Sequence, residues 1–191
     1  MATSAEALPR RLKLTVDDYR RMVEAGIVDE RRRVELIDGE IIEMPPIGPR
    51  HLNLVNRLTR ALVLAVGERA VVSVQNPVLL PAHSEPEPDL VLFDPGVESR
   101  GDVVPGAADA LLVVEVADST LRHDRDVKVP LYARHDVPEV WLVEVQARSL
   151  VRYRTPREGG YASRDVPRLA EPIAPAALPE VTLDLSHLFD G

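Results

Sequence analysis

The sequence predicts an α/β (α+β) fold in which an N-terminal helix and a β-hairpin precede the core. Within residues 33–44 two β-prone runs flank an Asp-Gly pair, a strong hairpin signal because both turn residues tolerate positive φ. Apolar residues recur at three- and four-residue steps over residues 50–66, which indicates an amphipathic helix. Residues 110–116 are apolar except for Glu115, a pattern typical of a central strand covered on both faces.

The remaining elements follow from shorter signals. Thr15 is a suitable N-cap for a first helix that ends near Gly26. Further strands are expected over residues 70–75, 89–93, 139–145 and 150–154, with a helix after residues 118–120, a loop over 96–109, extended surface chain over 156–180 and a docked segment over 181–189. We expect residues 1–14 to form a flexible arm and residues 15–191 to form one domain, with its core at about residues 33–155.

Composition excludes several classes of protein. The chain has 191 residues, of which 45% are hydrophobic and 28% charged, as in ordinary globular proteins. It contains no apolar run of the roughly 20 residues that a membrane span needs, and its start lacks the apolar segment of a signal peptide. Cysteine is absent, which excludes disulfides and cysteine zinc sites. A cytoplasmic protein without a membrane partner is therefore expected.

The charge balance argues against non-specific attraction to nucleic acid. The formal net charge is −8, whereas binding to nucleic acid relies on phosphate neutralisation by Lys and Arg. A local basic groove remains compatible with this balance. Only Lys13 and Lys128 are lysines among the 23 basic residues, which gives Lys128 some weight because ammonium and guanidinium groups are not interchangeable.

Two carboxylates lie in or beside apolar runs. Asp89 opens the run 89–93, and Glu115 interrupts the run 110–116. Buried acids are rare without a cation, so a metal ion or Lys128 is expected to supply one. The two acids reach each other only if their strands pair. In that case they would suit Mg²⁺ or Mn²⁺, which take one or two protein carboxylates together with substrate phosphate.

Simpler interpretations exist for each of these residues. Asp89 could cap a turn, and Glu115 could pair with a buried arginine. Lys128 lies four positions after Asp124, so the two could form a surface ion pair. The three groups Asp89, Glu115 and Lys128 nevertheless fall on consecutive elements, which favours a shared site.

Four further residues are candidates for accessory roles. Glu35 could be a third carboxylate over the site or an ordinary glutamate on an edge strand. His51, at a helix start, could act in the site or cap the helix. Gln75 ends the strand expected over residues 70–75, and Asp124 lies four positions before Lys128.

Five segments in this order resemble the PD-(D/E)XK nuclease superfamily, most closely its Uma-type branch of restriction endonucleases. The likeness covers about residues 15–155. The segments are Val34-Glu35-Leu36-Ile37-Asp38-Gly39-Glu40, Pro88-Asp89-Leu90, Val113-Val114-Glu115-Val116, Asp124 with Lys128 and Tyr132, and Val137-Pro138-Glu139-Val140-Trp141-Leu142-Val143.

The resemblance implies a restriction-endonuclease-like mixed β-sheet flanked by helices and Mg²⁺-dependent hydrolysis of DNA phosphodiesters by a metal-activated water. Asp89 and Glu115 would be the two acids, catalytic and metal-binding. This sequence departs from the superfamily pattern because Ala117 stands where the lysine is expected. Lys128 would then supply the amine from the helix, and Ala117 could offer its backbone carbonyl to the metal.

Two other functions compete with a nuclease. One is a binding or accessory module that has kept the fold but lost catalysis, which the acidic charge and the displaced lysine favour. The other is a toxin-like or structural oligomer, for which strand edges near residues 150–154 would suit dimer contacts. For the nuclease, DNA is the expected substrate and a homodimer the expected assembly, the latter by analogy of fold.

Overall fold

The computed structural model describes residues 11–29 and 31–190, so most of the arm expected over residues 1–14 lies outside the described residues. The mixed α/β fold is confirmed. The helices are α1 (Val16–Glu24), α2 (Pro49–Val66), α3 (Leu121–His123) and α4 (Val129–Arg134). The strands are β1 (Val34–Ile37), β2 (Glu40–Glu43), β3 (Val71–Val74), β4 (Leu90–Phe93), β5 (Ala110–Ala117), β6 (Glu139–Glu144), β7 (Ser149–Arg157) and β8 (Gly160–Asp165).

Six strands form one mixed sheet in the order β3-β4-β5-β6-β7-β8. Neighbours are antiparallel except β5 and β6, which run parallel and are joined by the crossover through α3 and α4. The central strands β4, β5 and β6 are buried along almost their whole length. This explains why each reads as a nearly continuous apolar run rather than an alternating one.

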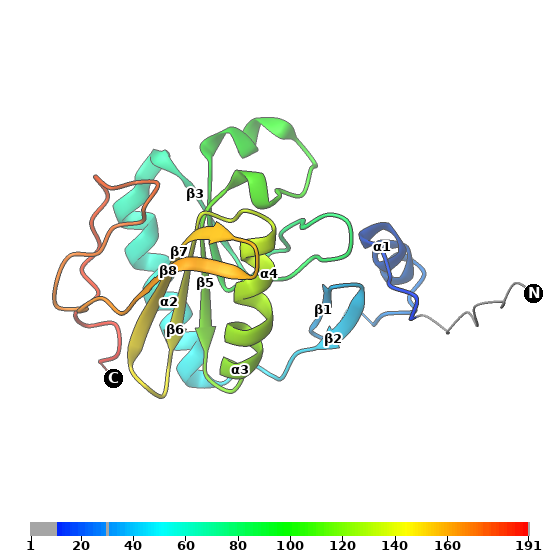
Figure 1. The fold of residues 1–191 in the computed structure, drawn as a ribbon, viewed down its shortest axis with the longest axis horizontal. Coiled ribbons are helices and arrows are strands. Elements are labelled where there is room, and N and C mark those ends of the chain that lie inside the picture. The colour runs from blue at the N-terminus through cyan, green and yellow to red at the C-terminus, as the bar shows by residue number, and fades with distance from the viewer. Residues whose placement is uncertain (1–10, 30, 191) are drawn as a thin grey trace, which may run out of the picture.

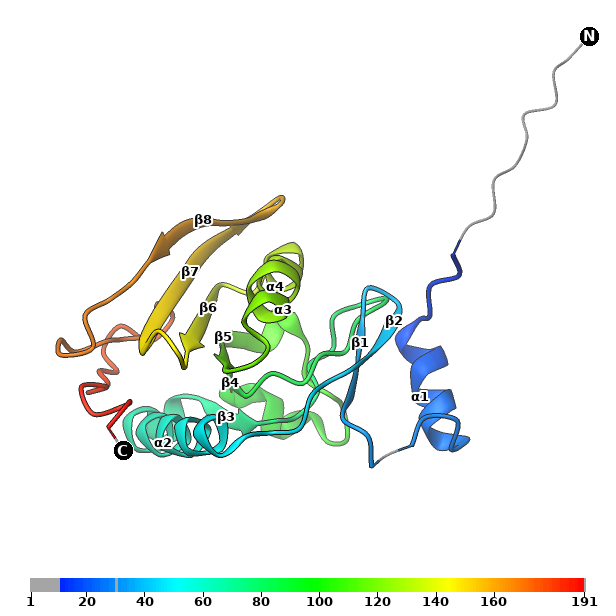
Figure 2. The same cartoon turned by 90° about the horizontal axis from the view of Figure 1, so that it is seen from below.

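Helices cover the sheet on opposite faces, as Figures 1 and 2 show. The apolar stripe of α2, with Leu58 and Leu62 fully buried, packs on one face together with the C-terminal segment. The other face is covered by α4, whose Leu131 and Tyr132 are fully buried. Among the described residues, no helix combines the length and the apolar character needed to cross a membrane.

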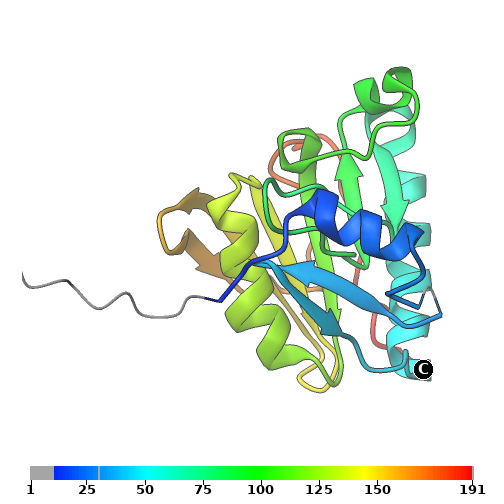
Figure 3. The same cartoon turned by 90° about the vertical axis from the view of Figure 1, so that its right-hand side faces the viewer.

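The expected hairpin is present as a separate two-stranded sheet of β1 and β2. Its turn residues Asp38 and Gly39 have φ values of 48° and 79°, the positive values that an Asp-Gly turn tolerates. Helix α1 begins at the expected cap, where Thr15 and Asp18 form a capping box. In Figure 3 the hairpin crosses in front of the sheet, between α2 on one side and α3 and α4 on the other.

Two regions have more structure than we expected from sequence. The expected surface chain over residues 156–180 instead begins with the end of β7 and the whole of β8, which form an antiparallel edge hairpin. Its strands are mostly polar on their exposed face, so no apolar run marks them. The loop over residues 96–109 contains two short 3₁₀ helices, Pro95–Arg100 and Ala107–Asp109.

The helix that carries Lys128 is wound unevenly. Residues Asp124–Lys128 form a π-helical turn between α3 and α4, in which the Val129 N–H donates to the Asp124 carbonyl five residues earlier. Pro130 follows directly and lacks an N–H, so an ordinary α-helix would lose a hydrogen bond and clash at this point. The wider turn accommodates the proline. It also leaves both Asp124 and Lys128 buried.

Candidate active site

The pairing of β4 with β5 brings the two carboxylates together. Leu90 lies opposite Val114, so Asp89, one residue earlier, lies opposite Glu115 in the antiparallel register. Directly opposed residues share a face of the sheet, with Cβ atoms about 4.5–5.5 Å apart. The Val116 N–H donates to Oδ2 of Asp89 at 2.8 Å, so the carboxylate reaches across to β5 and does not cap a turn.

Lys128 supplies the cation for Glu115. Its Nζ lies 2.7 Å from Oε1 of Glu115 and 3.2 Å from Oε1 of Glu35, and the lysine is only 1% exposed. A surface ion pair with Asp124 is therefore the wrong interpretation of Lys128. A buried arginine beside Glu115 is likewise wrong, because the partner is this lysine.

Tyr132 is a site residue whose role sequence reasoning missed. Its hydroxyl donates to Oε1 of Glu115 at 2.6 Å, and the ring is completely buried. Tyr132 lies four residues after Lys128, so the two occupy the same face of the helix. That spacing was the available signal, because a tyrosine beside a buried lysine carries a hydroxyl that needs a polar partner.

Asp89 is held by two of the accessory candidates. Nε2 of His51, in the first turn of α2, lies 2.9 Å from Oδ2 of Asp89. The Gln75 side-chain amide donates to Oδ1 at 3.2 Å. Gln75 has a φ of 51°, an uncommon value for a residue other than glycine, and such outliers cluster at functional sites. Together with the Val116 N–H, these groups fix the orientation of the carboxylate.

Glu35 and Asp124 complete the charged lining. Glu35 is 3% exposed, so it is not an ordinary edge-strand glutamate, and its Oε2 is buried without a hydrogen-bond partner. Asp124 is buried as well and accepts a hydrogen bond from the Thr120 hydroxyl. The structure therefore brings all the sequence-predicted polar side chains into one region.

A pocket of about 260 Å³ between the hairpin, the start of α2 and the π-helical turn is lined by Glu35, His51, Asp89, Glu115, Asp124 and Lys128. Gln75 and Tyr132 do not line it and contact it through Asp89 and Glu115. Arg33, Glu87, Asp118 and Ser119 also line it and were not expected from sequence. Ala117 does not line it. Its methyl group packs in the core under α4, and its carbonyl accepts the Val145 N–H at 3.0 Å.

Burial and mutual repulsion set the charges of the site. Burial raises the pKa of Glu115 to about 8; Lys128 opposes this shift, while Asp124, Asp89 and Glu35 add to it. Burial alone would lower the pKa of Lys128, but the charges of Glu115, Glu35 and Asp124 outweigh it and raise that pKa. Lys128 therefore remains an ammonium, and a second cation would favour ionisation of Glu115.

The donor set fits a small hard cation that keeps most of its water. Asp89 and Glu115 offer two opposed carboxylates, and the unpartnered Oε2 of Glu35 offers one more oxygen at the same pocket. Within residues 11–29 and 31–190 no group of three or more acidic or histidine side chains forms a ready cage. Mg²⁺ typically uses one or two protein carboxylates and retains several waters, so it needs no such cage.

The six-stranded mixed sheet with helices on both faces places the protein in the class of nuclease-fold α/β proteins. The chain belongs to the Uma2 family, described as "Putative restriction endonuclease", whose model matches residues 16–186. Its fold is similar to that of a solved "putative nuclease belonging to DUF820" from Anabaena variabilis, with a TM-score of 0.70, 18% identity, and 92% of this chain and 97% of that chain covered. No curated protein matches the sequence. Family membership supports a nuclease-type function on nucleic acid.

Proposed function

We propose that this protein is a metal-dependent endonuclease that hydrolyses DNA phosphodiester bonds by direct attack of water. The observation that carries the proposal is the placement of Asp89, directly before β4, beside Glu115 on the paired strand β5, with the Lys128 ammonium 2.7 Å from Glu115 at an open pocket. Two acids and an ammonium at one point are the groups that such hydrolysis requires.

Each of these residues has a distinct role in the proposed reaction. Asp89 is held by His51, Gln75 and the Val116 N–H, so it presents a fixed carboxylate to the pocket. Bound Mg²⁺ or Mn²⁺ would supply positive charge to the phosphodiester and lower the pKa of the attacking water. Lys128 stabilises the charge that develops on the phosphate oxygens, and Tyr132 orients Glu115. Glu35 competes with Glu115 for the same ammonium.

A plasmid-nicking assay with Mg²⁺ tests this proposal. Supercoiled plasmid is incubated with wild type, Asp89→Asn and Lys128→Ala. A matched control is Asp126→Asn, which removes an exposed acid from the same helical turn. Nicking by wild type and by the control alone supports the proposal. Equal nicking by all four proteins would indicate a contaminant or a different site.

A catalytically inactive binding or accessory module is the second candidate. The observation that favours it is the position of Lys128, whose single ammonium lies 2.7 Å from Glu115 and 3.2 Å from Glu35 and so already offsets part of the negative charge that would attract a metal ion. Calorimetric titration with Mn²⁺ separates the two functions. Binding that disappears in Glu115→Gln supports the nuclease, whereas no binding to either protein supports the inactive module.

The assembly is a further part of the proposal. Residues 150–154 are not the sheet edge expected from sequence, because β7 pairs with both β6 and β8. The edge is β8, and nucleases that cut both DNA strands commonly act as pairs, so we propose a homodimer by analogy of fold. Sedimentation of the wild type, with and without DNA, would show its mass directly. A monomer under both conditions would contradict the dimer and leave the site unaffected.

A further inference from the structure

A second set of polar side chains lies beside the candidate active site, on the outer side of α2. We propose that this arginine groove holds one strand of the nucleic-acid substrate as it leaves the active-site pocket. The inference rests on the proposed function. The groove is lined by Arg50, Asn53, Arg57, Arg60, Arg148 and Phe189.

The groove follows one stripe of α2. Arg50, Asn53, Arg57 and Arg60 recur at three- and four-residue steps, so they lie on one face of the helix. Ten residues separate the first arginine from the last, about 15 Å at 1.5 Å per residue. Since phosphates of one strand repeat about every 3.4 Å along a duplex axis, the stripe can accompany several phosphates. Two hollows of about 340 and 570 Å³, which share Arg57, form the groove.

The groove adjoins the active-site pocket at two points. Arg50 of the groove is the neighbour in sequence of His51, which binds Asp89 in the pocket. The Gln146 side chain, in the groove, donates to Oδ1 of Asp118, in the pocket lining, at 2.7 Å. A strand with one phosphodiester in the pocket can therefore continue directly into the groove.

The charge of the groove opposes the charge of the whole chain. The chain carries a net charge of −8, but the groove gathers four arginines against two acids, Asp184 and Asp190. Asp190 is already engaged, because its carboxylate lies 2.7 Å from Nδ1 of His187 and 3.8 Å from the Arg148 guanidinium. A local excess of arginine on an acidic protein is the feature expected of a phosphate-binding path.

Arg148 is held in place by two unusual features. Its φ is 51°, at the turn between β6 and β7. Its guanidinium lies 5.8 Å from the centre of the Phe189 ring, within the range of a cation–π contact. An arginine beside an aromatic ring can contact both a phosphate and an unstacked base, which suits a single strand. These two residues are 41 positions apart, so only the fold brings them together.

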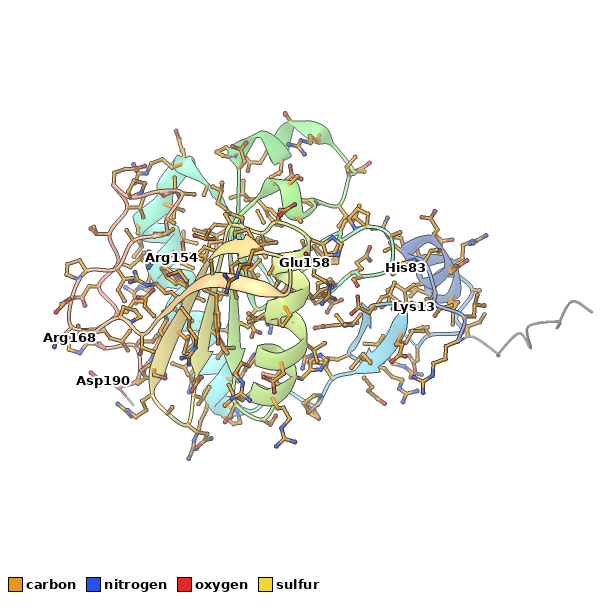
Figure 4. The ribbon with its side chains drawn as sticks, in the orientation of Figure 1. Lys13, His83, Arg154, Glu158, Arg168 and Asp190 are labelled. Carbon is orange, nitrogen blue, oxygen red and sulfur yellow. The ribbon has the colours of Figure 1, made fainter. Side chains whose placement is uncertain are left out.

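The test compares DNA binding by groove variants with binding by a matched control. The variants are Arg50→Gln, which keeps a good helix former, and Arg148→Asn, since asparagine tolerates positive φ. The control is Arg21→Gln on α1, which also removes an arginine paired with an aspartate. Figure 4 shows Asp190 of the groove and Lys13, which lies just before α1, at opposite sides of the molecule. Binding of a fluorescent single-stranded oligonucleotide is measured by anisotropy in EDTA.

We expect each groove variant to weaken binding by about three- to tenfold and to reduce the slope of log K against log salt by about 0.7, the loss of one phosphate contact on a single strand. The control should bind as wild type does. The proposal that the groove binds nucleic acid is wrong if the groove variants lose no more binding than the control does. It is also wrong if the wild type shows no measurable binding.

A small substrate separates the groove from the proposed function. Bis(p-nitrophenyl) phosphate contains a single phosphodiester and can occupy only the active-site pocket. Groove variants should hydrolyse it at the wild-type rate and nick plasmid more slowly. Oligonucleotide binding that depends on Arg50 and Arg148, without any hydrolysis, would retain the groove and reject the nuclease. Hydrolysis with groove-independent binding would reject the groove alone.

Discussion

Glu115 and Glu139 are buried glutamates on the neighbouring strands β5 and β6, with 3% and 0% of their surface exposed. Glu139 faces the α2 side of the sheet, where the Trp141 indole N–H donates to Oε1 at 2.9 Å and the Ala176 N–H donates to Oε2 at 2.6 Å. Glu115 faces the α4 side, beside a lysine, three further acids and an open pocket.

The difference between the two acids lies in their partners and not in their burial. Each oxygen of Glu139 receives a neutral N–H from the protein, and the carboxylate fastens the C-terminal segment to the sheet. Glu115 depends on a shared ammonium, and its neighbour Glu35 keeps an oxygen without any partner. A buried acid beside a cavity therefore indicates a catalytic or metal-binding role when the surrounding protein groups do not fully compensate its charge.

Replacing Lys128 should have the largest effect, because it removes the cation on which Glu115 depends and which Glu139 does not need. Lys128→Met leaves Glu115 and Glu35 without their ammonium, and removing one partner of a buried pair typically costs about 3–5 kcal/mol. Chemical denaturation above pH 8, where Glu115 is ionised, measures the loss. Added Mn²⁺ should restore part of it by replacing the missing positive charge. A loss below about 1 kcal/mol would show that the acids are neutral in the folded state.

Glu115→Gln should remove activity while leaving the fold intact. Residues that only orient metal ligands typically contribute about 10–100-fold, so loss of a ligand should reduce the nicking rate by more than about 100-fold. The Tyr132 hydroxyl can still donate to the amide oxygen of the glutamine. Initial nicking rates at saturating Mg²⁺ provide the measurement. A reduction under tenfold would place the metal elsewhere.

Glu139→Gln is the matched substitution, with the opposite expected outcome. One of its two N–H donors would face an amide NH₂, which should cost about 1–3 kcal/mol of unfolding free energy, with nicking unchanged. Burial raises the pKa of Glu139. The free energy of unfolding that Glu139 contributes is therefore fully present below the pKa of the unfolded state and declines as pH rises through the pKa of the folded state. The stability deficit of the variant should therefore be largest at low pH. A stability deficit that grows with pH would instead show that the pKa of Glu139 is lowered in the folded state.

Gln75→Asn should have the smallest effect. Asparagine tolerates the φ of 51° but its shorter side chain cannot keep the 3.2 Å hydrogen bond to Asp89. We expect about tenfold slower nicking, at the lower end for a residue that orients a ligand, with stability nearly unchanged. The nicking rate of Gln75→Glu would then test the effect of charge, since a further acid beside Asp89 should slow nicking more than asparagine does. Wild-type rates in both variants would remove Gln75 from the site.

The elements that sequence predicted best were those with a strong local pattern. The hairpin followed from one Asp-Gly pair, α2 from its regular apolar stripe, and β5 from a run interrupted only by Glu115. The edge strand β8 was missed because its residues are partly exposed and mostly polar. An edge strand owes its place to pairing with β7, which leaves little signal in its own residues.

The site was harder to predict than its members. Asp89, Glu115 and Lys128 stood out as charges near apolar runs, but their meeting depends on the β4–β5 register and on the packing of a helix over the strand. The hydroxyl of Tyr132 and the imidazole of His51 could be assigned partners only in three dimensions. The arginine groove was invisible for the same reason, since Arg148 and Phe189 come from distant turns.

The π-helical turn Asp124–Lys128 has a consequence for how related chains are aligned. Such a turn contains one residue more than the α-helix around it, and each residue of an α-helix advances by about 100°. A relative with regular winding here would match this chain only with a one-position gap inside the helix. Alignments that omit the gap would pair Lys128 with a side chain pointing roughly a quarter-turn away, and would score the amine as absent where it is only displaced.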